Sequence, residues 1–478
     1  MKTKKKSRLY FSGAILVTLT FFVIKIPYLS LPYFWDEAWS YIPAVEWMRV
    51  HGPGLLPGAI PPELSRGHPL LFYFLASSWQ LIFGNSPTAT HVFPLLISCA
   101  FMLALFFFIK RFFDEYIALT TIILVACMQI FFVQSGLLLP EIIMALWTIL
   151  VLHSWLADRK ILYFIFASLM LLTKESGFAL IAAIFIVQAG ILLLNKEKKS
   201  PGAILLQLSA ILSPLIFPLI FFILQKLRFG WVFFPEHMDK VSFDPGNIYS
   251  TLKAVLNIIF INDGRIFMLI ALIFAILYFL VRFKNFIRMK VFLKKEMLIL
   301  IYFLVFIVFY IAFCIINFFT DRYLLAILPL FVFIFVFLFI KLLPKRYLHI
   351  PVFSVLLFLS VFSFFRNTRV QDVSICYADV VKVHHSAVKF LEDNNYYEKR
   401  MYVPYLMTFN LRYKFLGYLS GNKNFRNLTT NLKDTSFVFM VLSFDSDTAE
   451  FYQFQRDNNL KLLRRFEKGI VNTEIYIP

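Results

Sequence analysis

Two adjacent carboxylates, Asp36 and Glu37, follow the first long apolar run of the chain, within the stretch SLPYFWDEAWSYIPAVEWM at residues 30–48. Carboxylates are costly to place in hydrocarbon, whereas the tryptophans of this stretch are typical of the boundary between a bilayer and water. We therefore expect the pair to lie at a membrane surface. A carboxylate at that depth could accept a proton from a substrate whose polar group is held at the same level.

Other charged residues are expected on the same side of the membrane. Arg66 and His68 lie further along the same loop, in the stretch PPELSRGHPLLFYF, and Glu141 begins a later apolar segment. Lys174 ends one apolar segment, and Arg322 begins another. Arginine binds phosphate through two parallel hydrogen bonds, and lysine acts as a point charge. The four basic residues are therefore candidates for holding a phosphate near the carboxylates.

Each of these residues also has an interpretation without chemistry. The carboxylate pair could cap the helix that follows it, and Glu141 could favour a helix N-terminus. Lys174 could form a local pair with Glu175. Arg322 could be an anchor whose side chain extends to the membrane interface. The residue types and spacing leave both interpretations open.

The composition is that of a chain with many membrane-spanning helices. Of 478 residues, 60% are hydrophobic and 19% aromatic, and the mean hydropathy is +0.75. A soluble domain is typically about 45–50% apolar. The net charge is +19, but the basic residues cluster in short segments between apolar runs, as in cytoplasmic loops of membrane proteins. The charge therefore does not indicate a nucleic-acid partner.

The apolar runs predict about eleven membrane spans of the roughly 17–25 residues that a hydrocarbon core requires. They fall near residues 10–31, 90–109, 116–134, 140–157, 161–174, 177–194, 203–224, 265–282, 297–316, 322–341 and 347–365. The first run lacks a small-residue cleavage site, so we interpret it as an uncleaved anchor. The basic segments all fall on the side of the N-terminus, which is therefore predicted to be cytoplasmic. The sequence predicts a multi-pass protein of an inner or plasma membrane.

The remainder of the chain, residues 366–478, is polar and lacks long apolar runs. Its helix and strand patterns predict a small α/β domain, and the odd number of spans places this domain on the extracytoplasmic side. We predict two domains, a membrane domain at 1–365 and this outer domain at 366–478. His384 and His385 are interpreted as the solvated face of a helix. The four cysteines lie far apart and predict neither a disulfide framework nor a CxxC metal site.

Several motifs together resemble those of a known superfamily. They are the Asp-Glu pair after the first span, the long first loop with GHP and LIFGNS, an acidic residue in the second outer loop, and DRYLLAILPLF near the last spans. In order and sidedness they resemble the GT-C membrane glycosyltransferases, specifically the dolichyl-phosphate-mannose protein mannosyltransferases and the lipid A aminoarabinose transferases. The resemblance covers most of residues 25–340. Many relatives have HPPL where this chain has HPLL.

The resemblance implies a GT-C-like fold and a specific reaction. Members transfer a sugar from a polyprenyl-phosphate donor to a lipid, glycan or protein acceptor on the outer side, with inversion at the anomeric carbon. Asp36 would be the general base, and Glu37 or Glu141 would orient the acceptor or hold the base. The donor phosphate would be bound by basic residues, for which the candidates are Arg66, His68, Lys174 and Arg322. No cofactor is certain, and a divalent metal remains open because no metal site maps onto this sequence residue by residue.

Two other classes of protein remain as alternatives. A transporter or flippase for amphipathic solutes would also be polytopic, but transporters usually have internal repeats and charged residues at the bilayer midplane. Here the ionisable residues cluster toward one face, and no repeat is found. A non-catalytic scaffold with an outer binding domain would leave the clustered carboxylates without a role. The sequence therefore favours an enzyme that works on a lipid-linked substrate.

Overall fold

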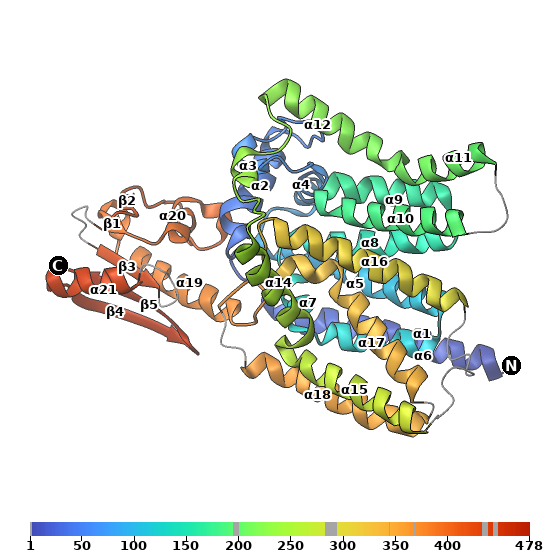
Figure 1. Ribbon diagram of the computed structural model, residues 1–478. Coiled ribbons are helices and arrows are strands. Elements are labelled where there is room, and N and C mark those ends of the chain that lie inside the picture. Colours follow the sequence, from blue (N-terminus) through green and yellow to red (C-terminus); the bar gives the residue numbers. More distant parts are fainter. Residues whose placement is uncertain are drawn as a thin grey trace.

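The computed structural model describes residues 2–194, 200–282, 294–343, 345–366, 370–432, 438–442 and 448–478. Its helices form a bundle, and a mixed unit of helices and strands lies at one end of that bundle (Figure 1). The N-terminus lies at the opposite end of the bundle from the sheet (Figure 1). We call the described residues from 370 onward the C-terminal unit.

Within the described residues, seven helical segments are long and apolar enough to cross a membrane. They contain the helices α1 (Lys2–Lys25), α5 (Pro87–Phe112), α10 (Phe178–Leu194), α11 (Pro201–Leu212) with α12 (Ile216–Phe229), α15 (Arg265–Arg282), α16 (Lys294–Ile316) and α18 (His349–Arg366). Five shorter apolar helices accompany them: α4 (Leu71–Phe83), α6 (Glu115–Ala126), α8 (Glu141–Leu156), α9 (Lys160–Thr173) and α17 (Leu328–Leu342). The chain is therefore a multi-pass membrane protein.

The predicted number of eleven spans is not confirmed. Every predicted span overlaps one of these helices, but those near 116–134, 140–157, 161–174 and 322–341 fall on helices shorter than the length required. The first of these four is broken into two helices. The helix α6 ends at Ala126, Met128 is extended, and α7 (Gln129–Gln134) follows. The last begins with the 3₁₀ helix η7 (Asp321–Ala326) before α17.

Non-helical backbone at membrane depth is tolerated where it is buried in protein or lines a cavity. The breaks before α17 and after α6 are of this kind, because most of η7 and all of α7 are buried. Phenylalanines from several helices fill the interior, and Phe101, Phe106 and Phe303 are fully buried. By contrast, Leu205 and Leu206 on α11 are exposed, as expected for a helix that faces lipid.

The first outer loop is largely helical. A π-helical turn at Glu37–Tyr41 leads into α2 (Ile42–His51), and α3 (Pro62–Ser65) precedes α4. The turn and α2 form one continuous helical segment. Val45 and Met48 are buried on its inner face, whereas Trp47 and Val50 are exposed. Two further helices, α13 (Pro235–Met238) and α14 (Pro245–Phe260), lie between α12 and α15.

The C-terminal unit contains a five-stranded sheet, so the predicted α/β architecture is confirmed. The elements are α19 (Tyr377–Asp393), β1 (Met401–Tyr402), α20 (Tyr405–Arg412), β2 (Leu428–Thr429), β3 (Val438–Leu442), α21 (Thr448–Asp457), β4 (Lys461–Lys468) and β5 (Val471–Ile477). The strand order is β2-β1-β3-β5-β4, in which β1 pairs in parallel with β2 and β3. The pairs β3–β5 and β4–β5 are antiparallel.

One prediction about this unit is wrong. His384 was expected on a solvated face together with His385, but its side chain is buried. Burial lowers the pKa of His384 to about 3, because the imidazolium form is disfavoured away from water. His384 is therefore a neutral core residue.

Candidate active site

The charged residues meet at Arg322, which η7 brings to the N-terminal end of α17. Its Nη2 atom pairs with Asp36 Oδ2 and its Nη1 atom with Asp372 Oδ2. Its Nε atom lies 3.5 Å from Glu141 Oε1. The Arg322 side chain is only 3% exposed, so it is not an interface anchor. A buried guanidinium requires paired carboxylates, and residues from three separate segments supply them.

Glu141 also binds the lysine predicted for the site. Lys174 Nζ lies 2.9 Å from Glu141 Oε1 and 3.7 Å from the centroid of the Tyr323 ring. Glu141 begins α8 directly after Pro140, and Lys174 is extended because α9 ends at Thr173. The N-terminal end of α8 and the C-terminal end of α9 therefore hold the Glu141 carboxylate against the Lys174 ammonium group. Lys174 pairs with Glu141, not with its neighbour Glu175.

The cluster carries more negative than positive groups. Three carboxylates, those of Asp36, Glu141 and Asp372, surround the two cations Arg322 and Lys174. Burial raises the pKa of Asp372 even though Arg322 contacts it. Nearby carboxylates act in the same direction, because like charges in one site disfavour ionisation.

A tryptophan connects Asp36 to the remainder of the first outer loop. Trp39 Nε1 donates a hydrogen bond of 2.8 Å to Asp36 Oδ1. The guanidinium of Arg66 lies over the same indole, 4.4 Å from the ring centroid. Asp36 is 17% exposed, more than any other charged side chain that contacts Arg322. It is therefore the carboxylate of this cluster most open to a substrate.

Beside this cluster lies a cavity of about 350 Å³. Arg66, His68 and Lys174 line it together with Glu175 and His237. The remaining walls are mainly aromatic and apolar, and they consist of Phe178, Phe233, Phe234, Met238, Val241, Phe313, Phe318 and Tyr323 with Gly67, Ser176 and Asn317. The cavity thus combines basic groups with apolar walls. We call it the basic-aromatic cavity.

Its basic residues are held in place by specific contacts. His68 Nδ1 lies 2.8 Å from Glu175 Oε2, and the rings of His68 and His237 are 5.1 Å apart. Burial, together with the charges of His68 and Arg66, lowers the pKa of His237 to about 3. His237 is therefore neutral, and it adds no charge to the cavity.

The glycine of the GHP motif has a steric role. Gly67 has a φ of +76°, and a Cβ atom there would lie 3.0 Å from Phe234 Cβ and 3.1 Å from the Phe234 backbone nitrogen. Its carbonyl accepts a hydrogen bond of 3.2 Å from Gln225 Nε2. Only glycine allows the segment that holds Phe234 to approach this closely. The motif therefore closes the cavity between the first outer loop and the segment after α12.

Glu37 lies in a different environment. Its carboxylate is completely buried and accepts hydrogen bonds from the backbone nitrogens of Phe34 and Leu138, at 3.2 and 2.5 Å. His91 Nε2 lies 3.2 Å from the same carboxylate. These partners belong to the first outer loop, to the segment before α8 and to α5. Glu37 therefore joins three elements and does not line the basic-aromatic cavity.

The structure thus brings six of the seven predicted site residues together, and Glu37 is the exception. Asp36, Glu141 and Arg322 form the charged cluster, and Arg66 and His68 line the cavity that Lys174 shares with them. Sequence reasoning did not find Asp372, His237 or Trp39 as members of the site. Asp372 follows the last apolar run and has no motif around it. Trp39 was identified only as a marker of the membrane interface.

No metal site is found in the part of the chain that the structure describes. No group of three or more His, Cys, Asp or Glu side chains there is arranged to hold a metal ion. The charged cluster instead pairs its carboxylates with Arg322 and Lys174. The described residues therefore do not fit a resident metal.

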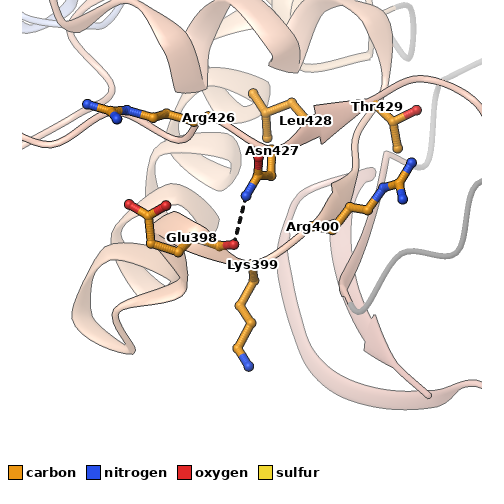
Figure 2. A pocket seen from close by; sticks show the side chains of 7 residues that line it. All are labelled: Glu398, Lys399, Arg400, Arg426, Asn427, Leu428 and Thr429. Atoms are coloured by element: carbon orange, nitrogen blue, oxygen red, sulfur yellow. Dashed lines mark hydrogen bonds between the residues drawn. The ribbon is translucent and has the colours of Figure 1, made fainter.

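A larger cleft, of about 670 Å³, lies in the C-terminal unit. It is lined by Glu398, Lys399, Arg400, Arg426, Asn427, Leu428 and Thr429 (Figure 2). Its side chains do not converge, because those of Lys399, Arg400 and Arg426 point in three different directions (Figure 2). None of the predicted site residues lines it. We therefore assign the candidate active site to the charged cluster and the basic-aromatic cavity.

A family model described as dolichyl-phosphate-mannose-protein mannosyltransferase matches residues 67–222, which is less than half of the chain. No curated protein gives a significant sequence match.

Two solved structures are similar over nearly the whole length. The crystal structure of ArnT from Cupriavidus metallidurans in the apo state has a TM-score of 0.57 and 11% sequence identity, with 99% of this chain and 98% of that chain covered. The structure of the same ArnT bound to undecaprenyl phosphate has a TM-score of 0.58 and 12% identity, with 98% and 97% covered. The predicted resemblance to the GT-C glycosyltransferases and the predicted fold are thereby confirmed.

Proposed function

We propose that this protein is a glycosyltransferase that moves a sugar from a polyprenyl-phosphate donor to an acceptor, with Asp36 as general base. The observation that carries the proposal is the basic-aromatic cavity beside the charged cluster. A polyprenyl-phosphate sugar has an anionic head and an apolar tail, and the cavity offers basic groups and apolar walls to match them. The similar ArnT structure with bound undecaprenyl phosphate supports this donor class.

The donor phosphate would be held by Arg66, His68 and Lys174. Arg66 is stacked on Trp39, so its guanidinium has a fixed plane for two parallel hydrogen bonds. When the bond between the anomeric carbon and the phosphate oxygen breaks, the electron pair leaves with that oxygen. Preformed positive groups stabilise this developing charge and need not reorganise. The leaving polyprenyl phosphate therefore needs no general acid.

Asp36 would accept the proton from the acceptor as the acceptor attacks the anomeric carbon. An ordinary aspartate is a weak base for a hydroxyl, so it acts only as the proton becomes acidic in the transition state. One displacement from the face opposite to the phosphate inverts the anomeric configuration. Glu141 Oε2 is buried and has no hydrogen-bond partner among the described residues. It is our candidate for orienting an acceptor hydroxyl.

Arg322 is proposed to act on Asp36, and not on the donor phosphate. Two carboxylates already occupy its terminal nitrogens. This revises the sequence-based interpretation, which grouped Arg322 with the donor-binding residues. The membrane orientation, with the N-terminus cytoplasmic and this site on the outer side, is part of the same proposal. It is supported by the positions of the N-terminus and the C-terminal unit at opposite ends of the bundle (Figure 1).

The reaction class is tested with labelled polyprenyl-phosphate sugars added to membranes that contain the protein. We expect transfer of label by the wild type, no transfer by D36N, and transfer by the matched control E46Q. Glu46 lies in the same loop, where it pairs with Arg49. No transfer by well-folded wild type with any donor in the panel would contradict the proposal and would favour a transporter or a scaffold.

A further inference from the structure

A carboxylate of the C-terminal unit contacts the charged cluster. Asp372 lies after α18, and its Oδ2 atom pairs with Nη1 of Arg322, whose Nη2 pairs with Asp36. The backbone oxygen of Asp372 accepts a hydrogen bond of 2.7 Å from Gln134 Nε2, which fixes this segment against α7. One guanidinium therefore joins a carboxylate of the first outer loop to a carboxylate of the C-terminal unit.

A second contact holds the same loop from another direction. The backbone nitrogen of Tyr33 donates to Leu416 O at 3.2 Å, and the Tyr418 hydroxyl donates to Tyr33 O at 3.0 Å. Between these partners, Gly417 has a φ of +85°, and a Cβ atom there would lie 2.9 Å from Pro87 Cγ. The C-terminal unit thus holds the backbone three residues before Asp36.

We propose that Asp372 is a positioning residue, through which the C-terminal unit completes the active site by holding Arg322 against Asp36. The proposal rests on the function proposed above, because it assigns Asp36 as the base. Without Asp372, Arg322 would keep Asp36 at one terminal nitrogen and Glu141 only at 3.5 Å from Nε. A guanidinium gripped at both terminal nitrogens has a fixed plane, which fixes the direction from which Asp36 is approached.

Asp36, Asp372 and Glu141 surround the Arg322 guanidinium, and Lys174 binds Glu141. Asp36 and Asp372 occupy its two terminal nitrogens. Loss of either carboxylate would therefore change the position of Arg322 against the other.

The test uses the full-length protein and three variants, D372N, D372E and D379N. Asp379 is the matched control, because it is an acidic residue of the same unit that pairs with Lys468 and does not contact Arg322. For D372N we expect kcat to fall about 10²-fold, as for a misplaced catalytic group, with KM for the donor unchanged. D372E should give an intermediate kcat, and D379N should match the wild type.

A purely structural role would give a different result. Asp372 would then affect the melting temperature but leave kcat of the folded fraction unchanged, and this outcome would overturn the proposal. If D372N does not fold, D372E decides, because it keeps the charge and moves it by one methylene. A wild-type kcat for D372E would then contradict a positioning role.

A second measurement separates this proposal from the proposed function. The melting temperatures of D36N, D372N and the double variant form a cycle that needs no transfer activity. If the two carboxylates are coupled through Arg322, the shift in the double variant will differ from the sum of the single shifts. Additive shifts would overturn the coupling even if transfer is observed. Absence of transfer by the wild type would contradict the function and leave the cycle as the test of the coupling.

Discussion

Asp36 and Glu37 are neighbours in the sequence, yet their carboxylates belong to two different regions of the molecule. Asp36 lies in the charged cluster, is partly exposed and shares Arg322 with Asp372. Glu37 is completely buried, and backbone N–H groups and His91 surround it. Consecutive helical residues point about 100° apart around the axis, so one turn directs the two side chains to opposite surroundings.

This difference indicates how the loop combines stability with chemistry. A carboxylate that accepts several hydrogen bonds from backbone N–H groups has no capacity left for a substrate. Because Glu37 accepts from the segment that leads into α8, it sets the distance between the Asp36 turn and Glu141. We therefore infer that Glu37 supports the site, whereas Asp36 takes part in the reaction. The predictions below test this division.

The largest effect is expected for Asp36. A general base contributes about 10²–10⁴-fold to a rate, so D36N should lower kcat of the folded protein by that amount. E37Q should keep much more activity per folded molecule. The measurement is label transfer by purified protein, normalised to the folded fraction. Equal losses of kcat in the two variants would contradict the division between them.

A large effect is also expected for Lys174. Removing one preformed group that stabilises developing charge costs about 10²–10³-fold, so K174M should weaken both donor binding and transfer. K174M alone also leaves Glu141 buried without its partner, which costs about 3–5 kcal/mol of stability. The double variant K174M/E141Q should therefore regain stability but not transfer. Recovery of transfer in the double variant would show that Lys174 serves only to neutralise the buried charge of Glu141.

The effect of E37Q should appear in stability. A glutamine supplies only one acceptor oxygen, and its amide would face a backbone N–H or His91. A buried polar group without a suitable partner costs about 1–3 kcal/mol. Thermal unfolding in detergent at neutral pH measures this loss, and N85D, with a change at a polar residue of the same loop, serves as a comparison. An unchanged melting temperature for E37Q would show that its hydrogen bonds are dispensable.

A smaller effect, confined to acid pH, is expected for His384. The pKa of His384 is lowered to about 3 in the folded protein, whereas an unfolded histidine has a pKa of about 6.5. Between these two values the unfolded chain binds a proton that the folded protein does not. The free energy of unfolding is therefore unaffected above pH 6.5 and falls as the pH drops toward 3, by about 2 kcal/mol at pH 5. H384Q should reduce this acid sensitivity relative to the wild type. The exposed residue His51 provides the control H51Q, which should leave the pH dependence unchanged.

Much of the fold and of the site follows from local patterns in the sequence. The apolar runs located the helices, and the Asp-Glu pair, GHP and DRY located residues that the structure brings together. The number of spans did not follow, because breaks such as that after Ala126 depend on what the backbone packs against. Asp372 was missed because its role comes from a contact with Arg322 that lies 50 residues away in sequence. His384 was misassigned because a pair of adjacent histidines does not show which of the two side chains tertiary packing will bury.

The most direct test is the binding of a polyprenyl phosphate to purified wild type, D36N and K174M/E141Q. We expect D36N to bind as tightly as the wild type, because Asp36 acts on the acceptor and does not line the basic-aromatic cavity. K174M/E141Q should bind much more weakly, since it lacks a cation at the proposed phosphate position. Wild-type affinity in K174M/E141Q would contradict the assignment of this cavity to the donor.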